Sequence, residues 1–337
     1  MIGIQTFYYM DNYGAVLQCY ALERYLELNN ADVCVIKFVS PYMRPLRSRL
    51  KRIFLSTEQQ RKFKSFRDKF LKVKNLSYYD IIVIGSDQVW NPEITGYDTR
   101  WYSPNIDYGN VVAYAASIGK KKLSLSETEY FESAREILTS YRAIGIREQD
   151  GKEIMENVGI CSSVVCDPTL LLFDRKVEYE KLIEKCKPLV HEEYIFVYSL
   201  EASCYLDNAI QYAKDKFGVK VVAVHPVNIR LCKCDEFLEN VGVEEFLYLI
   251  KNSKIVITNS YHGMIFSLVF EKGILTIPHS QLSSRQEQLN SLLNTRIELI
   301  EENLYQIKEG KIDGDLKNFI EISKDFIAKE ILSDITS

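Results

Sequence analysis

The sequence predicts an α/β protein with two doubly wound domains that face each other across a cleft, followed by a helical tail. Short apolar strands alternate with amphipathic helices along nearly the whole chain. This alternation is typical of parallel sheets that carry helices on both faces. The chain has 337 residues, more than most single cores contain, and the alternation runs in two series, so we expect two domains.

The first series forms an amino-terminal domain, for which we expect residues 1–172. Its predicted strands are residues 2–6, 33–39, 80–85, 111–115, 143–146 and 163–166, and its main predicted helices are residues 15–28 and 127–141. The strands are largely continuous apolar runs, as expected where both faces of a sheet are covered.

The second series forms a carboxy-terminal domain, residues 188–305, which follows a charged helical stretch that ends at Pro188. Its predicted strands are residues 194–199, 220–224, 254–258 and 274–277, and its predicted helices are residues 204–217, 243–252 and 284–293. In the tail, residues 306–337, Phe319, Ile322 and Phe326 recur at helical spacing, which predicts one final helix.

The composition indicates a folded protein outside the membrane. The chain is 47% hydrophobic and 26% charged with a net charge of −4, and no stretch approaches the ~20 apolar residues of a membrane span. Met1 leads directly into an apolar strand rather than into a signal peptide. We therefore expect a cytoplasmic location.

The eight cysteines show no disulfide framework. Cys19, Cys34, Cys166 and Cys204 lie within or beside apolar or helical stretches, which predicts reduced core thiols. A C-x-C pair near residue 233 lacks the partner ligands of a zinc site, so we expect no metal.

Residues 41–76 differ from the rest of the chain because they are strongly basic. Between residues 44 and 74 the cations are Arg44, Arg47, Arg49, Lys51, Arg52, Arg61, Lys62, Lys64, Arg67, Lys69, Lys72 and Lys74. Phe63, Phe66 and Phe70 form an apolar stripe, which predicts an amphipathic helix. One interpretation is a solvated basic face; the other is peripheral contact with anionic lipid or a pyrophosphate-bearing carrier at the inner face of the membrane. Nucleic acid is not expected, because the net charge is negative and no binding motif accompanies the cluster.

A polar turn that carries a histidine lies between a buried strand and an apolar helix in "TNSYHGMIFSLVF". The turn comprises Asn259, Ser260, Tyr261, His262 and Gly263. Backbone N–H groups at a helix start attract anions, and a histidine there binds an anion when charged or moves a proton. The alternative is a histidine that only caps the turn.

A second strand, "YDIIVIGSDQVWNP", ends in Gly85 and then presents Ser86, Asp87, Trp90 and Asn91. A carboxylate orients or deprotonates a hydroxyl, and a tryptophan offers a flat face to a sugar ring. The alternative is an aspartate that caps the next turn and a tryptophan that fills the domain interface.

Three further places carry candidate residues. In "YMDNYGAVLQ", Asn12 is a plausible helix cap, Tyr13 follows it, and Gly14 permits close approach. Arg147 follows a short strand in "AIGIREQ" and Arg285 lies in "SSRQEQL"; each suits a carboxylate or phosphate, or forms a surface ion pair. The stretch "DPTLLL" is interpreted as structural.

In this order, the segments "NYGAVLQ", "IVIGSDQVW", "YAASIG", "IRE", "DPTLLL" and "TNSYHGMIFSLVF" resemble the polysaccharide pyruvyl transferase family over roughly residues 1–300. The resemblance implies two Rossmann-like domains of the GT-B type. It also implies transfer of pyruvate from phosphoenolpyruvate to a sugar as a cyclic ketal, with no separate cofactor. By position, Arg147 matches the family's donor-binding arginine and His262 matches its histidine.

This sequence departs from the family pattern in two places. Many members carry arginine two positions before the histidine, where this chain has Ser260, and we expect Arg285 to replace it. The acidic residue that follows Asn-x-Gly in the family is Ala15 here.

The resulting hypothesis divides the residues into three roles. His262 is the predicted general acid and Asp87 the predicted base. The predicted donor-binding residues are Arg147, Asn259, Ser260, Tyr261, Gly263 and Arg285, and the predicted acceptor-binding residues are Asn12, Tyr13, Ser86, Trp90 and Asn91.

Two alternatives remain open. One is a nucleotide-sugar-dependent glycosyltransferase in which His262 and Glu271 hold the diphosphate and ribose. The other is a non-catalytic sugar-binding or complex-forming subunit, which the absence of arginine at Ser260 favours.

Overall fold

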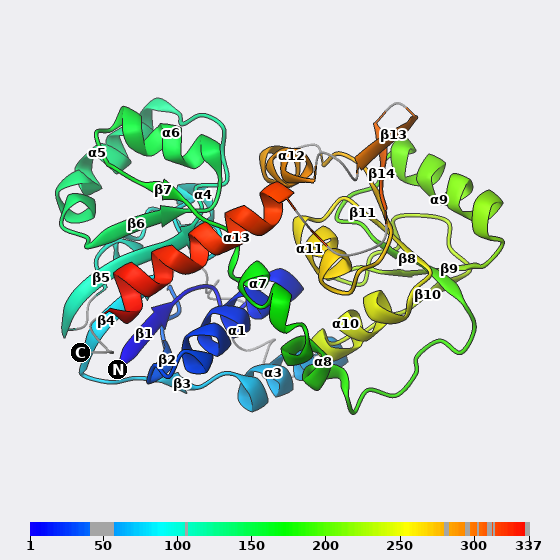
Figure 1. Ribbon diagram of the computed structural model, residues 1–337, viewed down its shortest axis with the longest axis horizontal. Helices are drawn as coiled ribbons and strands as arrows, with labels where there is room; N and C mark the ends of the chain where they lie inside the picture. Colours follow the sequence, from blue (N-terminus) through cyan, green and yellow to red (C-terminus); the bar gives the residue numbers. More distant parts are fainter. Residues whose placement is uncertain are drawn as a thin grey trace.

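The computed structural model describes residues 1–40, 57–104, 107–279, 283–293, 297–301, 303–308, 312 and 314–333. Within them the chain folds into two sheets of seven strands each, with helices packed around both (Figure 1). The predicted fold class, two doubly wound α/β domains with a carboxy-terminal helix, is confirmed.

The first sheet is parallel throughout. Its strands are β1 (Ile2–Gln5), β2 (Val33–Ile36), β3 (Val73–Lys74), β4 (Tyr78–Ile84), β5 (Asp107–Ala116), β6 (Ala143–Ile146) and β7 (Ser163–Val164). They lie in the order β3-β2-β1-β4-β5-β6-β7. The direction of winding therefore reverses between β1 and β4, and such reversal points are where open α/β sheets bind ligands.

Several helices of this half begin where a side chain caps them. They are α1 (Tyr13–Leu28), α3 (Glu58–Phe70), α4 (Pro92–Thr95), α5 (Leu125–Thr139), α6 (Gln149–Asn157) and α7 (Pro168–Leu171). The predicted cap of α1 is confirmed, because Asn12 Oδ1 accepts a hydrogen bond from the backbone N–H of Ala15 at 3.1 Å.

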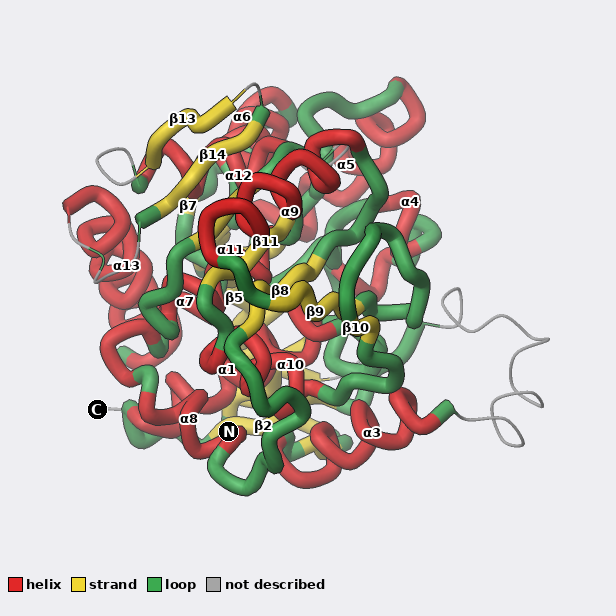
Figure 2. Tube along the Cα trace, turned by 90° about the vertical axis from the view of Figure 1, so that its right-hand side faces the viewer, coloured by secondary structure: helices red, strands yellow, loops and turns green. Residues whose placement is uncertain are grey.

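The second sheet repeats the same winding. Its strands are β8 (Tyr194–Tyr198), β9 (Lys220–Val224), β10 (Glu236–Phe237), β11 (Ile255–Thr258), β12 (Ile274–Thr276), β13 (Ile297–Glu301) and β14 (Leu304–Ile307), in the order β10-β9-β8-β11-β12-β14-β13. The reversal point lies between β8 and β11. Antiparallel β13 and β14, adjacent in Figure 2, were not predicted, because β13 is half exposed and lacks an apolar run.

The helices of this half match their predicted positions closely. They are α8 (Val177–Ile183), α9 (Cys204–Phe217), α10 (Val243–Asn252), α11 (Tyr261–Val269), α12 (Ser283–Leu292) and α13 (Gly314–Ile327), which ends in a π-helical turn (Ala328–Leu332). Helix α13 lies along the amino-terminal domain (Figure 1), where Ser323 Oγ accepts a hydrogen bond from the backbone N–H of Cys166 at 2.8 Å. The tail thus fastens the end of the chain to the first domain.

The two domains contact each other through buried aromatic side chains. The ring of Tyr13 stacks on that of Phe246 with centroids 4.2 Å apart, and the Tyr13 hydroxyl donates to the carbonyl of Val241 at 2.8 Å. Tyr13 is therefore a fully buried interface residue, and the prediction that it binds the acceptor is wrong.

Helix α3 holds most of the described basic segment, and its apolar stripe faces inward. Phe63 and Phe66 are fully buried in the core that the two domains share. On the same helix Lys62 pairs with Glu245 of the second domain at 2.8 Å. The stripe therefore stabilises the domain contact rather than a membrane contact. Peripheral contact of the basic segment with anionic lipid or a pyrophosphate-bearing carrier stays a prediction. Outside the described residues lie Arg44, Arg47, Arg49, Lys51 and Arg52.

The remaining composition-based expectations have mixed outcomes. Cys19, Cys34 and Cys166 are buried free thiols, whereas Cys204 is exposed at the start of α9, so its prediction as a core thiol is wrong. Among the described helices, none combines the length and the apolar character needed to cross a bilayer.

Candidate functional site

The carboxyl ends of β1, β4, β8 and β11 meet at a cavity of about 240 Å³ between the domains. Both reversal points therefore open onto the same space, as expected of a ligand site in doubly wound folds. The cavity is lined by Phe7, Met10, Asn12, Gly14, Ala15, Asp87, Gln88, Ile94, Tyr198, Leu200, Ser260, Tyr261, His262 and Arg285.

The predicted strand–turn–helix forms one wall of this cavity. Ser260 caps α11, because its Oγ accepts from the backbone N–H of Gly263 at 3.3 Å. Asn259 Oδ1 accepts from the N–H of Leu200 at 2.7 Å, which fixes the loop after β8 against the turn. The first N–H groups of a helix have no partner within it, so the start of α11 presents donors toward an anion.

His262 lies between the two domains. Its Nε2 is 3.5 Å from Asp167 Oδ2 and makes no hydrogen bond within the described residues. On the other side the imidazole packs directly on Gly14, where a Cβ would come within 2.1 Å of Nδ1. The expectation that Gly14 permits close approach is confirmed, and the group that approaches it is His262 itself.

Asp167 occupies the centre of the charged groups, although the sequence suggested only a structural role for its segment. It is fully buried, and it accepts hydrogen bonds from Thr169 and from Arg147 Nη1 at 2.9 Å. Burial alone would raise the pKa of Asp167, but His262 and Arg147 outweigh burial and hold it well below its usual range. The sequence signal that could have found Asp167 is its position shortly after strand β7, because Asp87 and Asn259 likewise come shortly after β4 and β11.

Arg147 is buried behind the cavity wall rather than exposed on it, with 2% of its surface accessible. Its Nε is 3.7 Å from Glu148 Oε2, and its Nη2 is 3.8 Å from Asp87 Oδ1. Burial would lower the pKa of Arg147, but Asp167, Asp87 and Glu148 outweigh burial and raise it. Its Nε and Nη2 therefore face two carboxylates but make no hydrogen bond within the described residues.

Arg285 lies within α12 and is the one arginine or lysine among the described residues that line the cavity. Burial lowers its pKa, and the positive charge of Arg147 lowers it further. The Tyr261 ring centroid is 5.8 Å from the guanidinium carbon of each arginine. The structure thus brings together two arginines, His262 and Tyr261 as the sequence predicted.

Asp87 lies on the opposite wall, in the loop after β4. Its backbone has a positive φ of 77°, and its Oδ1 accepts from the N–H of Gln88 at 2.8 Å. The carboxylate of Asp87 therefore lines the cavity, and a backbone N–H of the same loop hydrogen-bonds one of its two oxygens. Asn12 also lines the cavity, while its side chain caps α1.

The other predicted acceptor residues point away from the cavity. Trp90 is fully buried, with its ring 5.5 Å from that of Tyr102 and its Nε1 donating to the carbonyl of Trp101 at 3.2 Å. Its prediction as a sugar platform is wrong, because the indole fills the core of the first domain. Ser86 is fully buried, and Asn91 is 5% exposed and caps α4, so neither is placed to contact an acceptor.

Glu271, which the nucleotide-sugar alternative requires beside His262, does not line this cavity. It pairs instead with Lys176 at 3.1 Å. Its position therefore gives no support to a diphosphate and ribose site shared with His262.

His262 Nε2 is a buried polar atom of the cavity lining that makes no hydrogen bond within the described residues. Arg147 Nε and Nη2, Glu148 Oε2 and Asn259 Nδ2, next to lining residues, are also without one, as are further atoms elsewhere in the described chain. Buried polar groups are nearly always paired, so His262 Nε2 is a candidate partner for a polar ligand.

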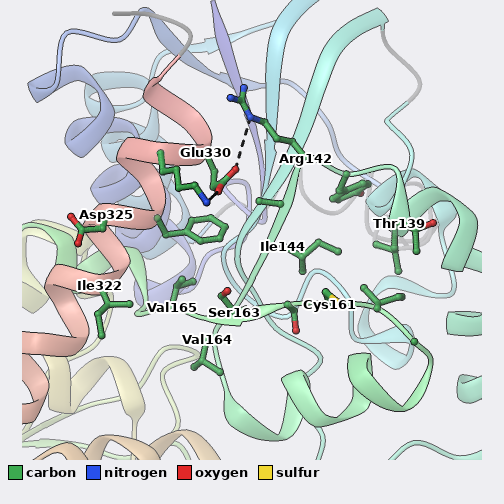
Figure 3. A pocket seen from close by; sticks show the side chains of 18 residues that line it. Thr139, Arg142, Ile144, Cys161, Ser163, Val164, Val165, Ile322, Asp325 and Glu330 are labelled. Carbon is green, nitrogen blue, oxygen red and sulfur yellow. Dashed lines mark ion pairs between the residues drawn. The ribbon is translucent and has the colours of Figure 1, made fainter.

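A larger cavity, about 650 Å³, lies elsewhere, between the edge of the first sheet and α13 (Figure 3). Ile144, Val165 and Ile322 line it, and Arg142 and Glu330 pair across it at 4.0 Å. It contains none of the predicted site residues.

Comparison with known proteins adds a family and several distant structural matches. The family model for polysaccharide pyruvyl transferases matches residues 12–281. No curated protein sequence matches the chain.

The similar solved structures share little sequence with this chain. UDP-GlcNAc 2-epimerase from Neisseria meningitidis is 12% identical, with 97% of this chain and 91% of that chain covered and a TM-score of 0.44. The enzyme of the same name from Methanocaldococcus jannaschii is 13% identical, with 97% and 92% covered and a TM-score of 0.44. The E. coli heptosyltransferase WaaC is 12% identical, with 86% and 99% covered and a TM-score of 0.36.

Proposed function

The chain belongs to the polysaccharide pyruvyl transferase family, and we propose that it transfers pyruvate from phosphoenolpyruvate to a sugar as a cyclic ketal. The proposed acceptor is a sugar of a polysaccharide or glycolipid precursor. The observation that carries the donor assignment is the small cavity where Arg285, His262 and the start of α11 converge.

The size and charge of the cavity favour this donor over a nucleotide sugar. Its volume of about 240 Å³ falls below the roughly 300–1,000 Å³ of pockets that enclose drug-sized ligands. Phosphoenolpyruvate is small and carries a carboxylate and a phosphate. Arg285 and the N–H groups of α11 offer partners for one anionic group. Arg147, whose Nε and Nη2 make no hydrogen bond within the described residues, is the proposed partner of the other.

His262 is the proposed general acid. It gives a proton to the methylene carbon of the donor, which becomes a methyl group, and the central carbon becomes electrophilic. One sugar hydroxyl adds to that carbon, phosphate leaves, and a second hydroxyl adds to close the ketal. Of the two hydroxyl protons released, one restores His262 and the other leaves with phosphate.

Asp87 is the proposed base for the attacking hydroxyl, because it lies on the cavity wall across from the α11 turn. With Trp90 buried, the acceptor must be held by other groups. Gln88 offers a polar contact beside Asp87, and Met10 and Ile94 offer an apolar surface. Asn12 remains a proposed acceptor contact from the start of α1.

Thermal unfolding with candidate donors tests the proposal. Phosphoenolpyruvate should raise the melting temperature, since a ligand that binds only the folded state stabilises it. A nucleoside diphosphate should not. Phosphate release from phosphoenolpyruvate with a panel of lipid-linked and free galactosides and mannosides then identifies the acceptor. Stabilisation by a nucleoside diphosphate alone would favour a glycosyltransferase, and stabilisation by neither would favour a non-catalytic subunit.

Gly14→Ala should reduce turnover without unfolding the protein. Alanine favours a helix more than glycine does, but its Cβ would overlap the imidazole of His262. The ring must then shift, and a displacement of about 1 Å is enough to cost roughly 10²-fold in rate. Steady-state phosphate release and thermal unfolding measure the two effects.

Cys19→Ala, in the same helix, is the matched control because it removes a buried atom without touching His262. It should lower stability slightly and leave turnover near the wild-type value. A Gly14→Ala enzyme with normal turnover would show that the position of the imidazole is not critical.

A further inference from the structure

We propose that Asp167 is a positioning residue for this reaction: one buried carboxylate holds Arg147 and orients the imidazole of His262 across the domain boundary. This inference rests on the proposed function, in which His262 delivers a proton. The Oδ2 atom of Asp167 is 2.9 Å from Arg147 Nη1 and 3.5 Å from His262 Nε2. The same oxygen therefore faces both groups.

The carboxylate is held so that it cannot turn away. Its Oδ1 accepts from Thr169 N at 3.0 Å and from Thr169 Oγ1 at 2.7 Å. The carbonyl of Thr169 in turn accepts from the hydroxyl of Tyr179 at 2.9 Å. Helix α7, which begins immediately after Asp167, packs on both α1 and α11. Oδ2 is thus directed at His262 by a carboxylate whose other oxygen is held in place.

A negative charge at this distance favours the protonated imidazole, which is the form a general acid requires. The imidazole also packs on Gly14 of α1, which carries no charge. The other charged groups around the cavity are Arg147, Arg285, Asp87 and Glu148, and Arg147 pairs with both of these carboxylates. Tyr261 is neutral, because burial raises its pKa. Asp167 is the carboxylate paired with His262.

A purely structural aspartate is the competing explanation, since Asp167 also caps α7 and balances Arg147. The two explanations differ in what happens to His262. Asp167→Asn keeps the size of the side chain and an oxygen for Thr169, but it removes the charge. If Asp167 orients and charges the imidazole, His262 should release its proton at a lower pH in the variant.

The test follows the imidazole resonances of histidine-labelled protein by NMR during a pH titration, with His262 identified by its loss in His262→Gln. In Asp167→Asn we expect its midpoint to fall, because the carboxylate charge beside Nε2 is gone. The alkaline limb of the pH dependence of kcat/KM should move in the same direction, and kcat should fall more than the KM for phosphoenolpyruvate rises.

Asp98→Asn is the matched control, because Asp98 also caps a helical turn and pairs with an arginine, Arg100, but has no contact with His262. It should leave the titration of His262 unchanged. If Asp167→Asn does not fold, Thr169→Val removes only the hydroxyl that fixes Oδ1. A carboxylate that is less firmly held should orient His262 less well, so kcat should fall more than the KM for phosphoenolpyruvate rises, and an unchanged kcat would count against the positioning role.

An unchanged His262 midpoint in the folded variant overturns the inference. The NMR titration needs no substrate, so its result does not depend on whether the protein is a pyruvyl transferase. The pairing of Asp167 with His262 and the proposed function are therefore tested independently. A shifted midpoint in a protein that neither binds nor cleaves phosphoenolpyruvate would overturn the proposed function and leave the pairing of Asp167 with His262 standing.

Discussion

His262→Gln should lower kcat by roughly 10²–10⁴, the usual contribution of a positioned general acid. Glutamine preserves much of the size and polarity of histidine, but it cannot deliver a proton to the methylene carbon of the donor. Donor binding should weaken much less, since Arg285 and the start of α11 remain. Steady-state phosphate release and calorimetric titration with phosphoenolpyruvate separate the two effects.

The pH dependence of kcat is a second test of His262 as the general acid. The pH profile of kcat should differ in shape between the wild type and His262→Gln, because only the wild type has an ionisable side chain at this position. His191→Gln is the control, because His191 is exposed and does not line the cavity. Near-normal turnover in His262→Gln would rule out the acid role.

The sequence predicted the fold well where structure depends on neighbours along the chain. Unbroken apolar runs located the buried parallel strands, and helices α9 and α10 begin and end where periodicity placed them. The turn from Asn259 to Gly263 was found because a polar cluster between an apolar strand and an apolar helix is visible in one segment. The strands β13 and β14 were missed, since their half-exposed antiparallel pairing leaves little apolar pattern.

The site predictions that were wrong concern residues whose neighbours come from distant segments of the chain. Trp90 has the sequence context of an exposed loop residue, yet it is enclosed by Tyr102 and Tyr141, which come from later in the chain. Tyr13 is buried by Phe246, more than two hundred residues away. Nothing local distinguishes a tryptophan that meets a sugar from one that meets another part of the core.

The contacts of Asp167 with Arg147 and His262 were not predicted, for the same reason. Its sequence neighbourhood, an aspartate followed by proline, is typical of a helix cap, and it does cap α7. Its second role depends on Arg147, twenty residues earlier, and on His262 in the other domain. Only the folded chain brings these charges together.

The pairing of Arg147 with Asp167 leads to the second large expected effect. Arg147→Ala leaves a fully buried carboxylate without its arginine, and removing one partner of a buried ion pair costs about 3–5 kcal/mol in the free energy of unfolding. The loss of stability should be greatest at neutral pH.

This pH dependence follows from the pKa of Asp167. In the wild type the depressed pKa of Asp167 contributes stability that is present above its pKa in the unfolded chain and is lost only as the pH falls through its pKa in the folded protein. Without Arg147 the carboxylate takes up a proton more readily in mild acid, so the difference in stability from wild type should narrow there. Urea unfolding at two pH values measures this.

Arg147→Ala should also weaken the binding of phosphoenolpyruvate by about 2–5 kcal/mol, because Nε and Nη2 of Arg147, which make no hydrogen bond within the described residues, are the proposed partners of a donor anion. The double variant Arg147→Ala with Asp167→Asn separates this effect from instability. Replacing the unpaired carboxylate with a neutral amide should recover part of the stability. The donor would still lack the guanidinium of Arg147. Calorimetry should therefore find the donor affinity as weak in the double variant as in Arg147→Ala. An affinity equal to that of Asp167→Asn alone would mean that Arg147 serves only to neutralise Asp167, and Arg285 would then be the sole arginine that binds the donor.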